Sequence, residues 1–548
     1  MGLMKMTALT IAAIGMTACA HRPETPAPII SAGTAIAADP GMILIGKIVT
    51  LNDAGDVWPN ARLWIREGRI EAIVKAGEPL PAVAAQARLV ETGGAIYPGL
   101  IDLHNHPEYA IYPLLPITRA YKDRYEWRFY DEAYEQRITS PQIVLADKSF
   151  FNLGMEIGRY GEYKALVGGT TTLQGGRDYQ PYSTSECLVR NIENSKVGAK
   201  LAVSKVDIGR DAPEWAELLK ARNNGLLVLH LAEGPSERMK GEYAAIKKSG
   251  LVGPELIAIH GVGLSEEQIA EMGANQVKLV WSPLSNFLLY GKTAKVGAAK
   301  KAGVLISLAP DWAPSGSKSI LGELKVADLV NKHELNSLFT ARELVDMVTR
   351  NPAQAMGWAD RAGQIAPGFV ADLLIVDDRH ADANRNLIES IEENVRLVTV
   401  RGELLYGDDK LMRELRAAND IEVAAQLGGK RTKMIAPNCS GTTLPVMSLA
   451  ETRARLQRGM DMDAGFLLKQ ATAAKVKEEF ARCSGGPPDG ALTADDTKRF
   501  LLCRYGLPYE KTPLSPLTTN EDPDFMTRLL ANKNLPGYLK WLPAYYRQ

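Results

Sequence analysis

The middle of the chain alternates between short, continuously apolar runs and longer stretches of helical character. Continuous apolar strands that alternate with helices are typical of a parallel sheet covered on both faces. Residues 98–359 have room for about eight such units, the size of a (β/α)₈ TIM barrel. We expect an irregular third unit, because 174–200 leaves little room for a strand and its helix. The apolar runs are LVGGTTTLQGG, AKLAVSKVDIG, GLLVLHLAEG, ELIAIHGVGL, VKLVWSP and GVLISLAPD.

Short strand-like segments flank this region on both sides. MILIGKIVTL and ARLWIREGRIEAIV precede it, and GQIAPGFVADLLIV and VRLVTVRGELLY follow it. Each is rich in β-branched and apolar residues and is broken by turn residues. We therefore predict a small β-sandwich domain built from 41–97 with 360–427. Residues 428–548 are predicted to be a C-terminal extension, helical at first and then irregular, that packs on or caps the rest.

The first residues have the proportions of an export signal. Lys5 is followed by a short apolar run and small residues, and the run is too short to span a bilayer comfortably. The sequence MTAC, which ends at Cys19, resembles a bacterial lipobox, whose cysteine is lipidated; ordinary signal-peptidase cleavage is the alternative. We expect a lipoprotein-type signal peptide over 1–19, a tether over 20–40, and a location in the bacterial cell envelope, lipid-anchored and facing the periplasm.

Composition narrows the class of protein. The 548 residues are 46% hydrophobic and 23% charged, which suits a large folded core. The formal net charge of +0 gives no whole-protein reason to expect a nucleic-acid partner. In an oxidising compartment a disulfide among Cys439, Cys483 and Cys503 is expected, with the pairing left open. The sequence also leaves the oligomeric state open.

Histidines gather at the ends of the apolar runs. His104 and His106 lie in LIDLHNHPEY, one residue apart, so their side chains point to the same side of a strand. His230 and His260 end later runs, and the last run ends in Asp311. In a barrel, chemistry takes place at this end of the strands. A single such histidine is usually a satisfied core residue, but this set predicts a metal site. Neutral imidazole and carboxylate suit Zn²⁺, and Fe²⁺ or Mn²⁺ less exclusively.

A second carboxylate follows one of these strands. Glu233 comes three residues after His230. A carboxylic acid in a partly desolvated pocket has a raised pKa and can shuttle protons. The structural alternative is a glutamate that stabilises a helix N-terminus.

Several motifs resemble the amidohydrolase superfamily, and in particular its cytosine, guanine and S-adenosylhomocysteine deaminase and triazine hydrolase branch. The resemblance runs from about residue 42 to 410. The motifs are PGLIDLHNH, HLAE, AIHGVGL, WSPLSN, the strand-end Asp311, and NPAQAMG followed by GQIAPGFVADLLIV.

The resemblance implies roles for the strand-end groups. It implies that His104, His106 and His230 bind the metal, and that Asp311 binds it or takes the proton of its water. An ion in such a site lowers the pKa of a bound water from about 15.7 toward 7. By the same resemblance, Glu233 delivers a proton to the leaving nitrogen.

Other residues are assigned to the surroundings of the ion. His260 resembles the sixth-strand histidine that polarises the substrate or, in two-metal relatives, binds a second ion; Lys205 is the other candidate second-metal ligand. The HLAE pattern favours one ion. Asn286 resembles a pocket residue, and Trp281 and Trp312 imply a crowded, apolar substrate-binding site. The tyrosine-, tryptophan- and arginine-rich segment 107–134 is a lid or substrate wall, or else a plain surface subdomain.

We therefore expect a metal-dependent hydrolase that cleaves a carbon–nitrogen bond, in an amide, lactam or related small molecule. Deamination or dechlorination of a heterocycle is the alternative within the superfamily. A non-catalytic binding lipoprotein of the envelope is the alternative outside it. Glu233→Gln separates the enzyme from the binding protein, because only an enzyme loses turnover.

Overall fold

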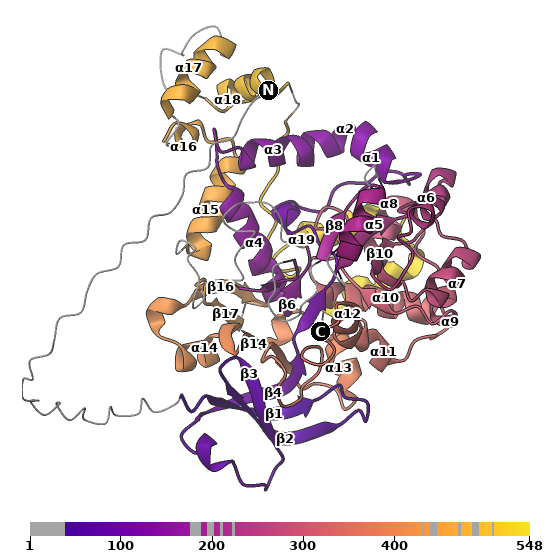
Figure 1. Ribbon diagram of the computed structural model, residues 1–548. Helices are drawn as coiled ribbons and strands as arrows, with labels where there is room; N and C mark the ends of the chain where they lie inside the picture. Colours follow the sequence, from indigo (N-terminus) through magenta and orange to yellow (C-terminus); the bar gives the residue numbers. More distant parts are fainter. Residues whose placement is uncertain are drawn as a thin grey trace, which may run out of the picture. The chain divides into compact units, whose positions relative to one another are not determined.

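The computed structural model describes residues 39–175, 188–193, 202–208, 212–221, 225–429, 431–438, 447–469, 473–484, 493–506 and 509–547 (Figure 1). The predicted signal peptide with Cys19, most of the tether, and Cys439 lie outside these residues. Among the described helices, none has the length and apolar character needed to cross a membrane.

Six of eight short parallel strands lie in the apolar runs given above, and the two-residue strand β7 lies in 174–200, where an irregular unit was expected. One sheet has the order β5–β6–β7 and the other the order β12–β11–β10–β9–β8, with every printed pairing parallel. A parallel bridge between Asn105 and Asp311 joins the end of β5 to the end of β12. The eight parallel strands are β5 Leu100–Asp102, β6 Thr170–Leu173, β7 Arg190–Asn191, β8 Ala202–Lys205, β9 Leu226–Leu231, β10 Leu256–His260, β11 Lys278–Trp281 and β12 Ile306–Leu308.

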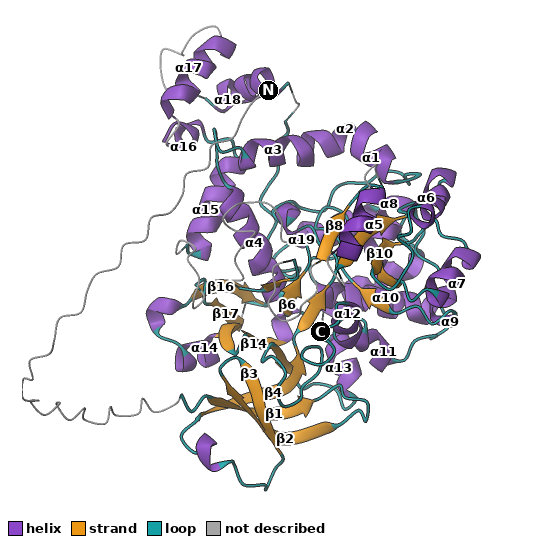
Figure 2. Cartoon of the chain, viewed as in Figure 1, coloured by secondary structure: helices purple, strands orange, loops and turns teal. Residues whose placement is uncertain are grey.

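Helices alternate with these strands along the chain, which gives an α/β fold (Figure 2). Strands β9 and β10 are buried along their whole length, as expected for parallel strands covered on both faces. Between β7 and β8 the described residues contain no strand pairing, so closure into a barrel is not part of the observed topology. The helices are α5 Ala212–Ala221, α6 Glu237–Lys248, α7 Glu266–Ala274, α8 Pro283–Tyr290, α9 Val296–Lys301, α10 Ile320–His333, α11 Ala341–Asp346 and α12 Arg350–Ala355.

Strands from both flanks combine into one mixed sheet. Its nine strands have the order β16–β17–β15–β14–β13–β4–β1–β2–β3, so the predicted β-sandwich is hydrogen-bonded as a single continuous sheet. The last strand lies beyond residue 427, where the sequence placed the end of this domain. The bounds are β1 Met42–Val49, β2 Val57–Arg66, β3 Arg69–Val74, β4 Arg88–Pro98, β13 Leu373–Asp377, β14 Val395–Val400, β15 Glu403–Asp408, β16 Glu422–Leu427 and β17 Arg431–Ile435.

A helical insertion follows β5 before the chain enters β6. Its elements are the short 3₁₀ helix η2 Pro107–Tyr109, α1 Arg124–Tyr130, α2 Glu132–Tyr134, the π-helical turn Glu135–Thr139, α3 Ser140–Ala146 and α4 Gly154–Val167. Asp123 begins α1 because its side chain accepts hydrogen bonds from the backbone N–H groups of Tyr125 and Glu126.

The C-terminal extension is mostly helical, as its sequence pattern predicts. Cys483 in α17 and Cys503 in α18 form a disulfide, which fixes the pairing that the sequence left open. Its helices are α15 Leu449–Met460, α16 Ala464–Lys469, α17 Ala473–Ser484, α18 Ala494–Tyr505, α19 Pro523–Ala531 and the 3₁₀ helix η7 Gly537–Tyr546, whereas α14 Asp409–Leu415 lies before it, between β15 and β16.

Candidate active site

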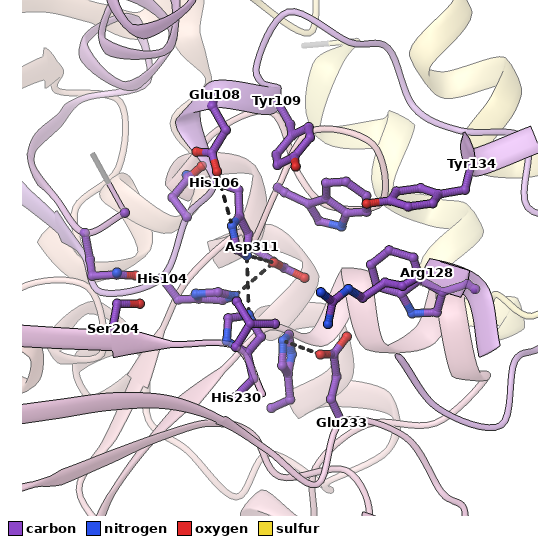
Figure 3. Close-up of a pocket in the computed structure, with 17 residues that line it drawn as sticks. His104, His106, Glu108, Tyr109, Arg128, Tyr134, Ser204, His230, Glu233 and Asp311 are labelled. Carbon is purple, nitrogen blue, oxygen red and sulfur yellow. Dashed lines mark hydrogen bonds and ion pairs between the residues drawn. The ribbon is translucent and has the colours of Figure 1, made fainter. Parts of the chain in front are cut away.

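The four strand-end histidines and Asp311 line one cavity, in which Figure 3 labels His104, His106, His230 and Asp311. His104 and His106 follow β5, His230 lies in β9, and His260 ends β10. His104 Nε2 lies 2.9 Å from Asp311 Oδ1, and the ring centroids of His104 and His230 are 4.6 Å apart. The side chains of His104, His230, His260 and Asp311 are buried. The structure therefore brings together the groups that the sequence assigned to the first ion and its water.

Three residues at these strand ends have a strained backbone conformation. His260 and Asp311 have φ angles of 69° and 71°, and Ala232, just before Glu233, has φ of 51°. Non-glycine residues rarely adopt this left-handed region, which costs about 1 to 3 kcal/mol per residue. The surrounding fold holds these three residues of the site in an unfavourable conformation.

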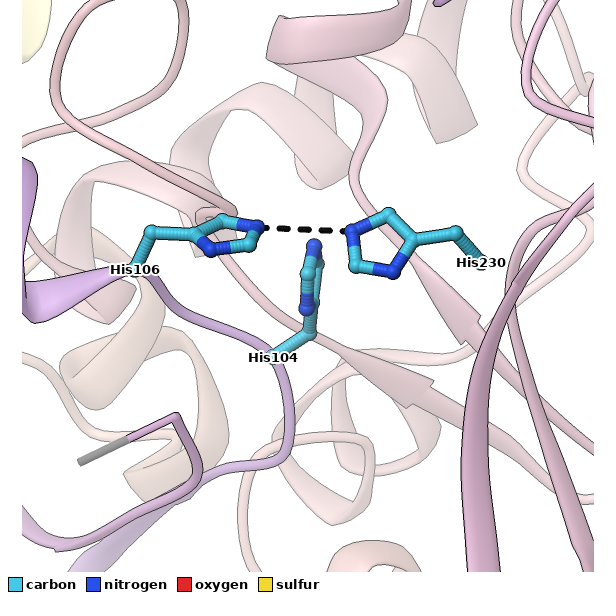
Figure 4. Close-up of side chains that lie close together, drawn as sticks. All are labelled: His104, His106 and His230. Carbon is cyan, nitrogen blue, oxygen red and sulfur yellow. Dashed lines mark hydrogen bonds between the residues drawn. The ribbon is translucent and has the colours of Figure 1, made fainter. Parts of the chain in front are cut away.

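The proton positions on the histidines fit a bound cation. His230 Nδ1 lies 3.2 Å from the carbonyl oxygen of Lys205, which can only accept, so Nδ1 carries the proton and Nε2 presents a lone pair. His106 Nε2 lies 3.3 Å from His230 Nε2, and His104 points between the rings of His106 and His230 (Figure 4). Two nitrogen ligands of a tetrahedral zinc ion are about 3.4 Å apart. The donor set and its spacing fit such an ion.

Three overlapping groups of donor atoms could hold the ion or ions, each with its ligand atoms within 4.8 Å of one another. They are His104 with His106 and His230, His104 with His260 and Asp311, and His230 with Glu233 and His260. Lys205 belongs to none of these groups. Its Nζ lies over the ring of Trp215 in α5, at 5.4 Å from the centroid.

Asp311 is held as a carboxylate. Ser285 Oγ donates a hydrogen bond to Asp311 Oδ2 at 2.6 Å, while Oδ1 faces His104. Burial alone would raise the pKa of Asp311, but the neighbouring histidines, His104 foremost, hold the pKa well below its usual value. A carboxylate in this state can bind a metal or accept a proton.

The pKa of Glu233 is shifted in the opposite direction. Its side chain is buried, and burial raises the pKa of this carboxyl group to about 7, although Arg124 opposes the shift. Its Oε2 lies 3.7 Å from His260 Nε2. An acid with a pKa near neutrality that faces the donor cluster is suited to move protons in both directions.

His260 is oriented by a chain of hydrogen bonds from behind. Trp281 Nε1 donates to Thr293 Oγ1 at 2.7 Å, and Thr293 Oγ1 donates to Asn286 Oδ1 at 3.4 Å. The amide nitrogen of Asn286 then faces His260 Nδ1 at 3.0 Å. An amide N–H can only donate, so the ring proton of neutral His260 is placed on Nε2, toward the cluster.

The hydrogen bonds behind His260 involve two residues that the sequence assigned to the substrate. We expected Trp281 and Asn286 to contact substrate, but both are 0% exposed and neither lines the cavity. Asn286 faces Nδ1 of His260, the ring nitrogen turned away from the cluster, and Trp281 is linked to Asn286 through Thr293. Trp312, in contrast, lines the cavity as expected.

A cavity of about 240 Å³ opens in front of the histidines (Figure 3). Trp127 stacks on Trp312 with ring centroids 5.3 Å apart, and Tyr134 packs against both rings. Arg128 and Glu108 add charge to the lining. The insertion after β5 therefore forms a wall of the cavity and is not a separate surface subdomain.

Glu108, Ser285 and Tyr290 are among the polar residues of this site that sequence reasoning missed. Glu108 is two residues from His106 and lines the same cavity. Ser285 and Tyr290 lie in α8 and contact the two carboxylates, Asp311 and Glu233. Tyr290 is four residues after Asn286 and hence on the same helix face, which was the signal available in the sequence.

The chain is similar to known enzymes over most of the region described above. Residues 218–405 match the amidohydrolase family. A 5-methylthioadenosine/S-adenosylhomocysteine deaminase of Caldicellulosiruptor saccharolyticus is 31% identical over 414 residues, which are 67% of this chain and 92% of the relative. A relative of the same name from Syntrophobacter fumaroxidans is 24% identical, over 68% of this chain and 94% of its own.

Solved structures share the fold. An adenosine deaminase from Xanthomonas campestris with bound zinc has a TM-score of 0.53 and 17% identity, over 66% of this chain and 92% of its own. An atrazine chlorohydrolase from Arthrobacter aurescens, complexed with zinc, has a TM-score of 0.55 and 18% identity, over 66% of this chain and 95% of its own. The resemblance seen in the sequence motifs is confirmed: this chain belongs to the amidohydrolase family and is an amidohydrolase-type hydrolase acting on carbon–nitrogen bonds.

Proposed function

We propose that this protein is a metal-dependent hydrolase that cleaves the bond between an sp² carbon and a nitrogen in a small molecule. The observation that carries the proposal is the convergence of three histidines and Asp311 beside the buried acid Glu233. His104, His106 and His230 would hold the ion, together with Asp311. When bound, a zinc ion supplies a Lewis acid and a water of lowered pKa. Zinc is favoured by the donor set, with Fe²⁺ or Mn²⁺ as the alternatives.

We propose one ion for each chain. The side chain of Lys205, the sequence's candidate for a second site, contacts Trp215. Ser204 and Val206 on either side of it line the cavity instead. The hydrogen bond from Asn286 also places a proton on His260 Nε2, and a protonated nitrogen does not bind a metal.

The remaining groups divide the proton transfers between them. Asp311 accepts a proton from the attacking water, since its low pKa keeps it ionised. Glu233 delivers a proton to the departing nitrogen, for which a pKa near 7 is well matched. His260 donates its Nε2 proton as a hydrogen bond to the oxygen or ring nitrogen that gains negative charge. Such preorganised donors are often the largest contribution to catalysis.

For the substrate, we propose a planar nitrogen heterocycle that loses an amino group. The aromatic wall of Trp127, Trp312 and Tyr134 suits a flat ring. The relatives named above are deaminases, which supports the heterocycle alternative over the amide or lactam that the sequence favoured.

We further propose that the two parallel sheets close into a (β/α)₈ barrel, in keeping with the family. Export and lipid anchoring at Cys19, with the enzyme facing the periplasm, remain a proposal from the sequence. The Cys483–Cys503 disulfide supports an oxidising compartment.

The test combines metal analysis with a substrate panel. We expect about one equivalent of zinc in purified full-length protein. We also expect ammonia release from aminopurine nucleosides or aminotriazines, and no opening of amides or lactams. Glu233→Gln should lower turnover by about 10²- to 10⁴-fold with the zinc retained. Metal-free active enzyme, or equal rates in the wild type and this variant, would falsify the proposal.

A further inference from the structure

Tyr290 contacts the proposed acid from outside the cavity. It is the last residue of α8, is 3% exposed, and does not line the cavity. Its Oη donates a hydrogen bond to Glu233 Oε1 at 2.6 Å. Tyr290 therefore touches neither substrate nor ion, and acts on the site only through Glu233.

A second hydrogen bond fixes the direction of the first. Trp127 Nε1 lies 2.9 Å from Tyr290 Oη, and an indole N–H can only donate. The hydroxyl of Tyr290 accepts from Trp127, and its single proton points to Glu233. The result is a directed chain from the indole N–H through the phenol O–H to one carboxylate oxygen.

The two oxygens of Glu233 are thereby made different. Oε1 is occupied by the Tyr290 hydroxyl, whereas Oε2 faces His260 Nε2 at 3.7 Å. We propose that Tyr290 is a positioning residue that locks the rotamer of Glu233 and assigns Oε2 as the oxygen that takes up and releases the transferred proton. This inference rests on the proposed role of Glu233 as the proton donor.

The end of α8 is held by two other parts of the chain. Tyr121, in the insertion after β5, donates its backbone N–H to the carbonyl of Leu289 at 2.8 Å. From the C-terminal extension, the side-chain amides of Asn532 and Asn534 donate to the carbonyl of Leu288, at 3.3 and 2.8 Å. The insertion also supplies Trp127. Both segments therefore meet at the turn that presents Tyr290.

The first test is structural and does not depend on a substrate. Tyr290→Phe keeps the ring and removes only the hydroxyl. In crystals of the zinc-loaded full-length variant, we expect the Glu233 carboxylate to leave its wild-type position or to occupy more than one rotamer. We expect His104, His106, His230 and the zinc to stay in place. A Glu233 side chain that does not move would overturn the proposal.

The second test is kinetic and uses the panel compound with the highest turnover. We expect Tyr290→Phe to lower kcat by roughly 10- to 100-fold with KM changed by less than about 3-fold, because only proton transfer is affected. In the Glu233→Gln background the same change should cause no further loss. An equal loss in both backgrounds would show that Tyr290 acts independently of Glu233, against the proposal.

Tyr406→Phe is the matched control. Tyr406 lies in β15, is fully buried, and its hydroxyl makes no hydrogen bond among the described residues. The kcat of the Tyr406→Phe variant should equal that of the wild type. If no panel compound is turned over, the proposed function fails, while the crystal structure of the Tyr290 variant still decides whether Tyr290 positions Glu233.

Discussion

At the scale of single residues, the site depends on where protons are placed. The carbonyl of Lys205 sets the tautomer of His230, and Asn286 sets that of His260. As a result, His230 presents a lone pair to the cluster, whereas His260 presents a proton. Residues that never reach the cavity decide which histidines can bind the ion.

The sequence was sufficient to find His104, His106, His230, His260 and Asp311. Their signal is local, since each ends an apolar run and the strand period fixes the side to which it points. Trp281 was assigned to the substrate from its place on a strand and Asn286 from a motif resemblance, and neither signal distinguishes the front of a neighbouring histidine from its back. Tyr290 was missed because its partner, Glu233, is brought close only by the tertiary fold.

The assignment of His230 as a ligand leads to a direct prediction. His230→Ala removes one of the nitrogens that face the ion, so we expect at least a 10-fold loss in zinc affinity. Metal analysis after dialysis against a zinc buffer measures it. His380→Ala is the control, because His380 lies on an exposed loop outside the cluster. Equal zinc contents in the two variants would remove His230 from the ligand set.

At the scale of elements, the insertion is joined closely to the turn that carries Glu233. The backbone N–H of Arg124 donates to the carbonyl of Glu233 at 3.1 Å, and that of Ser236 donates to the carbonyl of Lys122 at 3.2 Å. The Arg124 guanidinium is paired with Glu242 at 2.6 Å. The wall of the cavity and the proposed acid are thus positioned by the same contact. The sequence pattern of 107–134 gave no indication of this contact, because it is made through the backbone.

Gly234 makes this approach possible. Its φ is 126°, and a Cβ atom there would lie 2.5 Å from Asp123 Cα and 2.6 Å from the carbonyl oxygen of Lys122. We expect Gly234→Ala to destabilise the protein by about 2 to 4 kcal/mol, since strain and a backbone clash add. Chemical denaturation measures it.

Gly250→Ala separates the two contributions to that loss. Gly250 has a φ of 69°, but a Cβ atom there would meet nothing within 4 Å. We expect a cost of only about 1 kcal/mol for this control, from the left-handed conformation alone. A Gly234 variant that is no less stable than the Gly250 variant would contradict the close approach.

At the scale of the whole molecule, the described part of the C-terminal extension contacts the region that carries the site at several points. Ser515 Oγ accepts from the buried lysines Lys164 and Lys318, each at 2.9 Å, and Lys318 pairs with Asp522 at 2.7 Å. The sequence predicted a packing appendage without catalytic groups, and its described residues supply none to the cavity lining. Which surface such a segment covers is not encoded in a local pattern, so the sequence alone could not relate it to α8.

The contacts of Asn532 and Asn534 with α8 connect the extension to turnover. Asn532→Ala with Asn534→Ala removes the hydrogen bonds to Leu288, which frees the helix end that presents Tyr290. We expect faster amide hydrogen exchange at the end of α8 and a several-fold lower kcat, with zinc content unchanged.

Combined with Tyr290→Phe, the double change should lower kcat no further, because both act through Glu233. Asn520→Ala is the control, since Asn520 contacts Glu393 in another part of the molecule. If exchange at α8 rises while kcat stays at the wild-type value, the extension stabilises the helix without serving the acid.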